Sequence, residues 1–321
     1  MPTGTVMRST GSRYRVRGDD GTLHACVARG NLRVKGWKST NPVAVGDRVD
    51  YEPQTDPDRP GAITDLHDRR NYIVRRSVNL SHQRHVIAAN VDQLLLMVTV
   101  VRPWTSTGFI DRFLVTAEAY QVPVTILFNK VDDIRSEDEL DLLAEYQEIY
   151  EGIGYTTLIT SAVDGRGVNE VKQLLAGKVS LLAGHSGVGK STLVNAVEPA
   201  LELPTWEISD ASGKGRHTTT YAEMLPLEHL AGPGGEPTFI IDTPGVKGFG
   251  LVDLEEADIG DQFPEIFRVK GDCRFNNCMH KEEPGCAVRA AVEAGTIAPS
   301  RYHSYLDMLA GIGDEETYRT A

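Results

Sequence analysis

The chain lacks a hydrophobic run long enough to cross a bilayer. Among its 321 residues the longest apolar stretch is LLLMVTVV at 94–101, bounded by Asp92 and Arg102, whereas a membrane-spanning helix needs about 20 apolar residues. The first thirty residues are polar and rich in Gly and Arg, without the apolar segment of a secretory signal. We therefore expect no membrane partner and a cytoplasmic location.

Repeats, low-complexity tracts and abundant cysteines are also missing. Hydrophobic residues make up 40% and charged residues 24% of the chain, a composition that excludes disordered and collagen-like proteins and favours a globular protein of roughly two or three domains. Only four cysteines are present, and three of them lie within residues 273–286. In a reducing cytoplasm this clustering favours a metal site over disulfides.

Charge is unevenly distributed along the chain, whose formal net charge is −12. Residues 1–86 contain 15 Lys and Arg against 9 Asp and Glu, and the remainder contains 18 against 36. Short β-branched segments separated by turn residues predict that residues 1–86 form a small β-barrel resembling an OB-fold. Its basic surplus is compatible with a nucleic-acid partner, and a purely structural β-domain is the alternative.

Strand and helix patterns alternate beyond the predicted barrel. Apolar strands at 124–128 and 179–183 are interleaved with helical spacing, for example at 168–175, which is typical of parallel α/β architecture. From residue 254 a Cys/His cluster is followed by two helical stretches. The sequence thus predicts a multidomain α/β protein with a barrel at 1–86, an α/β domain at 87–253 and a helical metal-binding domain at 254–321.

A phosphate-binding loop follows the apolar strand at 179–183. The segment GHSGVGKS at 184–191 matches G-x-x-x-x-G-K-[ST] and precedes a helical stretch, the context in which backbone N–H groups converge on phosphates. Lys190 then reaches the β and γ phosphates and the Ser191 hydroxyl ligates Mg²⁺. The residues predicted to bind phosphate are Gly184, His185, Ser186, Gly187, Val188, Gly189, Lys190, Ser191 and Thr192.

Two short motifs predict guanine as the base. Asn129, Lys130, Val131 and Asp132 form N-K-x-D at the end of the strand at 124–128, and the carboxylate of Asp132 can accept from the N1 and N2 groups that adenine lacks. Ser161 and Ala162 follow the next strand, where backbone groups contact the guanine O6. Each motif alone could be an ordinary turn, and together with the phosphate loop they predict GTP.

A third set of residues is expected at the γ-phosphate. The strand at 238–241 ends in the D-x-x-G motif at 242–245, in which Asp242 lies near Mg²⁺ and Gly245 senses the γ-phosphate. Upstream, GRHTTT at 215–220 offers hydroxyls for the cation, and a β-strand start is the alternative for this threonine run. The predicted magnesium residues are Ser191, Thr219 and Asp242.

The hydrolytic step is predicted to be slow. Val246 follows the D-x-x-G motif, where many GTPases place the Gln that orients the attacking water. His217 lies beside the threonine run, and an imidazole can orient water or accept its proton. We therefore predict His217 and Lys190 as catalytic residues, with a His217 that only packs or contacts RNA as the alternative.

The order of these motifs is circularly permuted. N-K-x-D and the Ser-Ala segment precede the phosphate loop and D-x-x-G, whereas ordinary GTPases begin with the phosphate loop. Short right-handed connections between strands still allow one pocket to form. The segment after D-x-x-G then leads directly into the Cys/His domain.

Nearly the whole chain resembles the ribosome small-subunit-dependent GTPase A family. The features that carry this resemblance are the predicted barrel, the segments GHSGVGKST and GRHTTT, and the Cys/His cluster. The resemblance implies a protein that binds the small (30S) ribosomal subunit and its rRNA, assists late maturation among other assembly factors, and hydrolyses GTP to GDP and phosphate. We also expect a monomer. The subunit would stimulate hydrolysis, which times release. His185, where the family more often has Gln, is interpreted as a variable loop residue.

Two functions of other classes remain open at this point. A P-loop kinase acting on a small molecule would use the phosphate loop but has no need of N-K-x-D. A nucleic-acid-binding module would use the barrel while its nucleotide site only regulates and barely turns over.

The C-terminal cluster has the composition of a zinc site. Cys273, Cys278, His280 and Cys286 supply three thiolates and one imidazole, a closed tetrahedral set typical of structural zinc. The spacing is also that of the zinc-binding domain of the family. Isolated buried cysteines are the alternative, and His303 is interpreted as an ordinary helix residue. With no open ligand position, zinc is expected to stabilise the domain rather than to catalyse.

Overall fold

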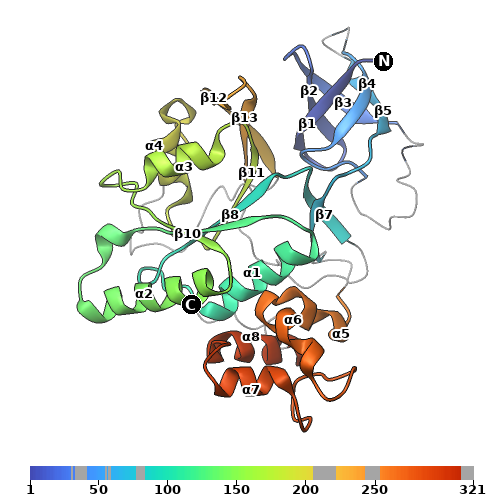
Figure 1. The fold of residues 1–321 in the computed structure, drawn as a ribbon. Helices are drawn as coiled ribbons and strands as arrows, with labels where there is room; N and C mark the ends of the chain where they lie inside the picture. The colour runs from blue at the N-terminus through green and yellow to red at the C-terminus, as the bar shows by residue number, and fades with distance from the viewer. Residues whose placement is uncertain are drawn as a thin grey trace, which may run out of the picture.

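Three units follow one another in the computed structural model: a barrel, an α/β body and a cluster of short helices (Figure 1). None of the helices described is long and apolar enough to span a membrane. The residues that the structure describes are 1–29, 32, 42–54, 56, 59–76, 84–204, 222–242 and 254–311.

The first unit is a closed five-stranded barrel. Its strands are ordered β1-β2-β3-β5-β4, and β4 pairs back onto β1. Alternate side chains point inward, as the period of two in a β-strand requires, and Val6, Tyr14 and Ile63 are among its buried core. The predicted barrel is thereby confirmed. The strands are β1 (Thr3–Ser9), β2 (Arg13–Gly18), β3 (Leu23–Ala28), β4 (Arg48–Glu52) and β5 (Gly61–Leu66).

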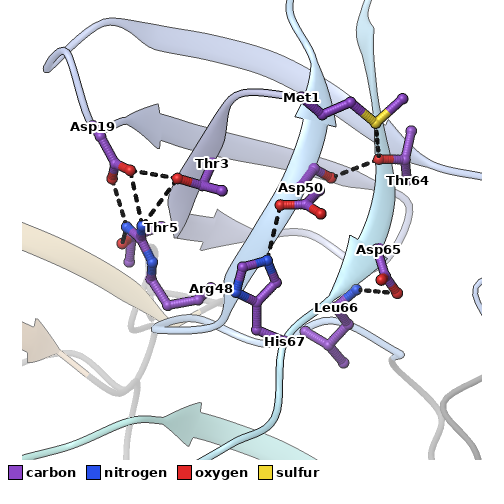
Figure 2. Close-up of polar contacts among 10 residues, drawn as sticks. All are labelled: Met1, Thr3, Thr5, Asp19, Arg48, Asp50, Thr64, Asp65, Leu66 and His67. Atoms are coloured by element: carbon purple, nitrogen blue, oxygen red, sulfur yellow. Dashed lines mark hydrogen bonds and ion pairs between the residues drawn. The ribbon is translucent and has the colours of Figure 1, made fainter.

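Part of the basic charge of the barrel is paired at its surface (Figure 2). Arg48 donates to both carboxylate oxygens of Asp19, at 2.7 and 3.0 Å, and to Thr5 at 3.1 Å. Hydrogen bonds from Arg48 and Thr3 lower the pKa of Asp19 to about 2. These contacts connect β1, β4 and the turn after β2, although exposed pairs of this kind contribute little stability individually.

A hairpin that the sequence analysis missed joins the barrel to the body. It consists of β6 (Tyr72–Arg76) and β7 (Arg84–Ala89), and Ala89 N donates to Val45 O at 2.8 Å. Gly46 has φ +89°, and a Cβ there would lie 2.0 Å from Ala89 O. Only glycine allows the barrel and the hairpin to approach this closely.

The body is a mainly parallel sheet with the order β10-β9-β8-β11-β13, extended by the antiparallel β12. Strand β12 also pairs with β1, so the barrel and the body share one eleven-stranded sheet. The bounds are β8 (Gln93–Val98), β9 (Val124–Phe128), β10 (Thr156–Ile159), β11 (Val179–Ala183), β12 (Glu223–Ala231) and β13 (Pro237–Asp242).

Helices cover both faces of this sheet. Helices α1 (Thr107–Ala119) and α2 (Glu137–Gly152) contribute to one apolar core, and α3 (Val168–Leu175) and α4 (Lys190–Val197) contribute to the other. Because both faces are covered, the central parallel strands are almost continuously apolar. This arrangement confirms the predicted α/β architecture.

The last unit consists of short helices packed beneath α1 (Figure 1). Arg301 is fully buried and pairs with Asp111 of α1 and with Glu265, at 2.7 Å each. Tyr150 donates to the same Asp111 carboxylate at 2.9 Å. This network of charges fixes the helical unit against the body. The helices are α5 (Glu256–Ile259), α6 (Pro264–Val269), α7 (Ala287–Glu293) and α8 (Pro299–Leu309).

Candidate functional site

The phosphate loop joins β11 to α4 and packs closely against two other loops. Gly184 has φ +147°, and a Cβ there would lie 2.3 Å from Met97 O at the end of β8. Gly189 has φ +95°, and a Cβ would lie 2.6 Å from Asn129 Nδ2. Glycine is therefore required at both positions, independently of any ligand.

Lys190, the first residue of α4, points its ammonium into this loop. Its Nζ donates to the backbone oxygens of Gly184 and His185, both at 2.7 Å. Burial lowers the pKa of Lys190 to about 8, and the nearby Asp242 opposes that shift. A cation held at a helix N-terminus among backbone N–H groups is suited to binding phosphate.

Asp242 ends β13 next to the phosphate loop. It lies opposite Leu182 in the parallel pairing of β11 with β13. Burial raises the pKa of Asp242, Lys190 lowers it and Glu223 raises it further. A half-buried carboxylate at this edge and the hydroxyl of Ser191 on α4 have the oxygen-donor chemistry that Mg²⁺ prefers, so these residues fit the cation.

Asn129 connects the base-recognition motif with the phosphate loop. Its side-chain Nδ2 donates to Val188 O at 2.7 Å, and its Oδ1 accepts from the Thr160 hydroxyl at 3.0 Å. Lys130 adopts a left-handed conformation with φ +60°, and its Nζ donates to Arg102 O at 3.2 Å. One buried amide thus connects three loops at the carboxyl edge of the sheet, where open α/β sheets bind ligands.

The two remaining base-reading segments lie beside Asn129. Asp132 is exposed in a single 3₁₀ turn, Val131–Asp133, directly after β9. Val131 N donates to Thr160 O at 3.4 Å, which places this turn against the segment that carries Ser161 and Ala162. The structure therefore brings the predicted base and phosphate residues together at one edge.

His185 has a packing partner that the sequence did not indicate. Its ring stacks on Phe109 of α1, with centroids 3.5 Å apart and planes at 26°. Burial, with a smaller contribution from Lys190, lowers the pKa of His185 and favours the neutral imidazole. The side chain is therefore an anchor between the phosphate loop and α1.

Some predicted site residues cannot be placed in this arrangement. Thr219 and the catalytic candidate His217 lie outside the described residues, as do Gly245 and Val246. Their assignment continues to rest on the sequence.

The four predicted metal ligands are brought together in the C-terminal unit. Ligand atoms of Cys273, Cys278, His280 and Cys286 all lie within 4.8 Å of one another. Nδ1 of His280 lies 3.6 Å from Cys273 Sγ and 3.4 Å from Cys286 Sγ. Three thiols and one imidazole in this arrangement could hold a metal ion with no ligand position left open.

Supporting residues around the cluster were missed by the sequence analysis. Tyr302 donates to His280 O at 2.5 Å, and Tyr305 donates to Met279 O at 2.8 Å. The carboxylate of Glu283 accepts from the backbone N of Met279 at 2.8 Å. Such contacts orient metal ligands, but the two tyrosines are more than twenty residues from the loop they hold, and no local motif marks them.

His303 is not part of the metal cluster. It is exposed on α8 and lies 3.6 Å from Asp307, one turn further along the helix. The interpretation of His303 as an ordinary helix residue is confirmed.

Comparisons with known proteins agree with this geometry. The model described as the RsgA N-terminal domain matches residues 3–63, and the model described as RsgA GTPase matches residues 66–252. Two relatives named small ribosomal subunit biogenesis GTPase RsgA are each 54% identical: that of Flavobacterium johnsoniae, over 99% of this chain and 95% of the relative, and that of Bacteroides fragilis, over 99% of both chains.

Solved structures give the same result. YjeQ from Thermotoga maritima is 35% identical, with a TM-score of 0.75 over 97% of this chain and 98% of that chain. YloQ, described as a circularly permuted GTPase, is 29% identical, with a TM-score of 0.69 over 98% of this chain and 96% of that chain. The permuted fold inferred from the motif order is confirmed, and with both family models matched in sequence this chain belongs to the RsgA GTPase family.

Proposed function

We propose that this GTPase binds the small ribosomal subunit and assists its late maturation, with hydrolysis stimulated by the subunit and timing release. The observation that carries the proposal is the hydrogen bond from Asn129 of N-K-x-D to Val188 of the phosphate loop, which joins the two motifs in one site. The relatives of this chain are named for small-subunit biogenesis. The kinase and the barely hydrolysing nucleic-acid module are not favoured, because the family and its named relatives are GTPases.

In this proposal each part of the edge has one task. Asp132 pairs with the guanine edge, and Lys190 binds the β and γ phosphates with the loop from Gly184 to Thr192. Ser191, Thr219 and Asp242 hold the Mg²⁺, which neutralises charge on the phosphate oxygens when bound. Gly245 senses whether the γ-phosphate is present, and backbone groups of Ser161 and Ala162 contact the base.

His217 is the proposed group at the attacking water. Oxygen from water bonds to the γ-phosphorus while the bond to the β–γ bridging oxygen breaks, so that GDP leaves and the water proton moves to a nearby base or to phosphate. An imidazole in the segment that precedes β12 can orient this water. The residue after D-x-x-G is Val246, where many GTPases have a Gln that orients the water. This position therefore supplies no side chain that could orient the water.

The barrel offers a basic face for rRNA. Arg13, Arg15 and Arg17 alternate along the outward side of β2, and Arg8 lies opposite Arg15 on β1. In the described part of the chain neither Arg13 nor Arg15 has an acidic partner, whereas Arg48 is paired with Asp19. Unneutralised arginines in a row suit a phosphate backbone.

The C-terminal cluster is the proposed zinc site. Cys273, Cys278, His280 and Cys286 hold one structural Zn²⁺, which stabilises the unit that begins at residue 254. The domains are 1–86, 87–253 and 254–321. A factor that acts on ribosomal subunits with other assembly factors works in the cytoplasm, and we propose that it does so as a monomer.

The test compares GTP hydrolysis by the full chain alone and with purified small subunits. Small subunits should raise the rate by at least tenfold, and large subunits should not. His217→Ala should keep GTP affinity and lose most of this stimulation. A rate that small subunits leave unchanged would contradict the proposal, and full stimulation of His217→Ala would assign the catalytic group to the ribosome.

A further inference from the structure

Four charged residues form one row across the junction of the barrel and the body. Arg15 of β2 lies opposite Arg8 of β1, Arg8 lies opposite Glu223 of β12, and Glu223 lies opposite Asp242 of β13. All three pairings are antiparallel, so directly opposite side chains point to the same face with Cβ atoms about 4.5–5.5 Å apart. The row leads from the basic face of the barrel to the proposed magnesium carboxylate.

Glu223 interacts with charged neighbours on both sides. Its Oε1 lies 3.9 Å from Arg8 Nη1, and its side chain is 28% exposed. On the other side it lies directly opposite Asp242 of β13, so the two carboxylates share one face of the sheet. The neighbouring Met224 is 3% exposed in the core beneath the sheet, which fixes the register of this part of β12.

We propose that Glu223 is a positioning residue of the magnesium site and that Arg8 is the barrel residue that controls it. The inference rests on the proposed role of Asp242 in holding the cation. Glu223 adds negative potential beside Asp242, where a divalent cation bound with nucleotide gains from it. Arg8 draws this carboxylate toward the barrel and offsets part of its charge.

The row also connects the two ligands of the protein. An RNA phosphate bound at Arg15 and Arg8 competes with Glu223 for the Arg8 guanidinium. When Glu223 is released from Arg8, the negative potential at Asp242 increases, which favours binding of the cation. Occupation of the barrel and affinity for Mg²⁺ are coupled in this way by a single ion pair, and such coupling is reciprocal.

The experiment measures GDP affinity of the full chain with saturating Mg²⁺ and with a chelator, and takes the ratio as the magnesium-dependent gain. Glu223→Gln should reduce this gain about three- to tenfold, the order of magnitude for one charge about 5 Å away when water screens it almost as in bulk solvent. Arg8→Gln should increase it about two- to threefold. Affinity in chelator should stay within twofold in both variants, because the phosphate loop is untouched.

Matched controls separate this role from a general charge effect. Glu228→Gln removes an acid from an exposed position of the same strand, and Arg29→Gln removes an exposed barrel arginine that is paired with Glu52. Both should leave the gain unchanged. Glu223→Asp keeps the charge and should retain most of the gain, which a purely structural role for Glu223 would not explain.

The double variant Glu223→Gln/Arg8→Gln completes a double-mutant cycle. Arg8→Gln should not change the magnesium-dependent gain when Glu223 has already been replaced by Gln. The inference is overturned if Glu223→Gln behaves like Glu228→Gln, or if Arg8→Gln acts equally in both backgrounds. If Glu223→Gln does not fold, the comparison of Arg8→Gln with Arg29→Gln is the test. Only Arg8→Gln should then increase the magnesium-dependent gain, and equal gains in the two variants overturn the inference. A wild-type chain whose GDP affinity does not respond to Mg²⁺ would instead contradict the proposed function.

Discussion

Asp132 is the residue on which base choice should depend. Its carboxylate is exposed directly after β9, beside loops that Asn129 holds in place. Asp132→Asn should weaken GDP binding at least tenfold, because the guanine N1 and N2 donors lose their acceptor, and should gain affinity for xanthosine diphosphate. Titration of both nucleotides measures this, and an unchanged preference would contradict the N-K-x-D assignment.

Asp19 should contribute a pH-dependent increment to barrel stability. Hydrogen bonds from Arg48 and Thr3 lower its pKa from 3.8 to about 2, so the stabilisation is fully present above about pH 4 and is lost as the pH falls through 2. Because the pair is exposed, the increment should stay below about 1 kcal/mol.

The measurement compares hydrogen exchange of β1 and β4 amides between wild type and Asp19→Asn. The difference should be present at pH 5 and shrink toward pH 2. Asp65→Asn, which removes a β5 acid without an arginine partner in the described residues, is the control. A difference that persists below pH 2 would exclude the ion pair as its source.

Residues of the site were predictable where chemistry fixes their spacing. The glycines of the phosphate loop and Asn129 belong to short motifs, and the close approaches at Gly184 and Gly189 show why other residues are excluded. The stack of His185 on Phe109 was not predictable. Its partner lies 76 positions upstream, so no local pattern marks the contact.

At the scale of elements, the attachment of α8 to α1 depends on Arg301. Removing it leaves Asp111 and Glu265 buried without their common cation. Burial alone would lower the pKa of Arg301, and these two carboxylates raise it above its ordinary value. Arg301→Met should therefore destabilise the helical unit by about 3–5 kcal/mol.

Hydrogen exchange of α8 amides is the direct readout for Arg301→Met. His303→Gln, on the exposed side of the same helix, should leave protection unchanged. Adding Asp111→Asn and Glu265→Gln should recover part of the loss, because the unpaired charges are then removed. Full protection in the single variant would show that packing alone holds the unit.

Metal coordination is the proposed second support of the same unit. Cys278→Ser removes one of the four candidate ligands of the cluster. The variant should lose bound zinc and increase protease cleavage within residues 254–311, because short helices with a small core are expected to depend on the metal. Metal analysis and limited proteolysis measure both effects. One zinc per chain with normal protection would contradict the assignment.

Elements were predictable where the apolar period was clear. The predicted segments at 124–128, 168–175 and 179–183 match β9, α3 and β11. Ser136 caps α2 by accepting from Glu139 N, and the Glu139 carboxylate accepts from Arg135 N. Strand β12 was missed because Pro226 and a register shift interrupt its alternation. The β6–β7 hairpin was also missed, because the sequence between the two strands has no tight turn motif that would predict it.

For the whole molecule, the uneven charge predicts how subunit affinity responds to salt. Arg13 and Arg15 lie on the outward side of β2, and Arg8 and Glu223 separate Arg15 from Asp242. The double variant Arg13→Gln/Arg15→Gln should weaken small-subunit binding and reduce the slope of log affinity against log salt by about two. GDP affinity should not change.

A salt series with purified subunits provides the measurement. Arg29→Gln/Arg48→Gln removes two barrel arginines that already have acidic partners and should change the slope much less. If both double variants give the wild-type slope, the barrel is not the electrostatic contact and the C-terminal unit would take that role.

The sharing of one sheet by the barrel and the body also affects solubility. An open strand edge is a template for pairing with other chains, and natural proteins cover such edges. Strand β12 carries the apolar Met224 and Leu227, and at Glu223 it is paired on both sides, with β1 and with β13. The barrel therefore also covers one end of this edge, and a GTPase fragment cut free of it would expose that end to pairing with its own copies.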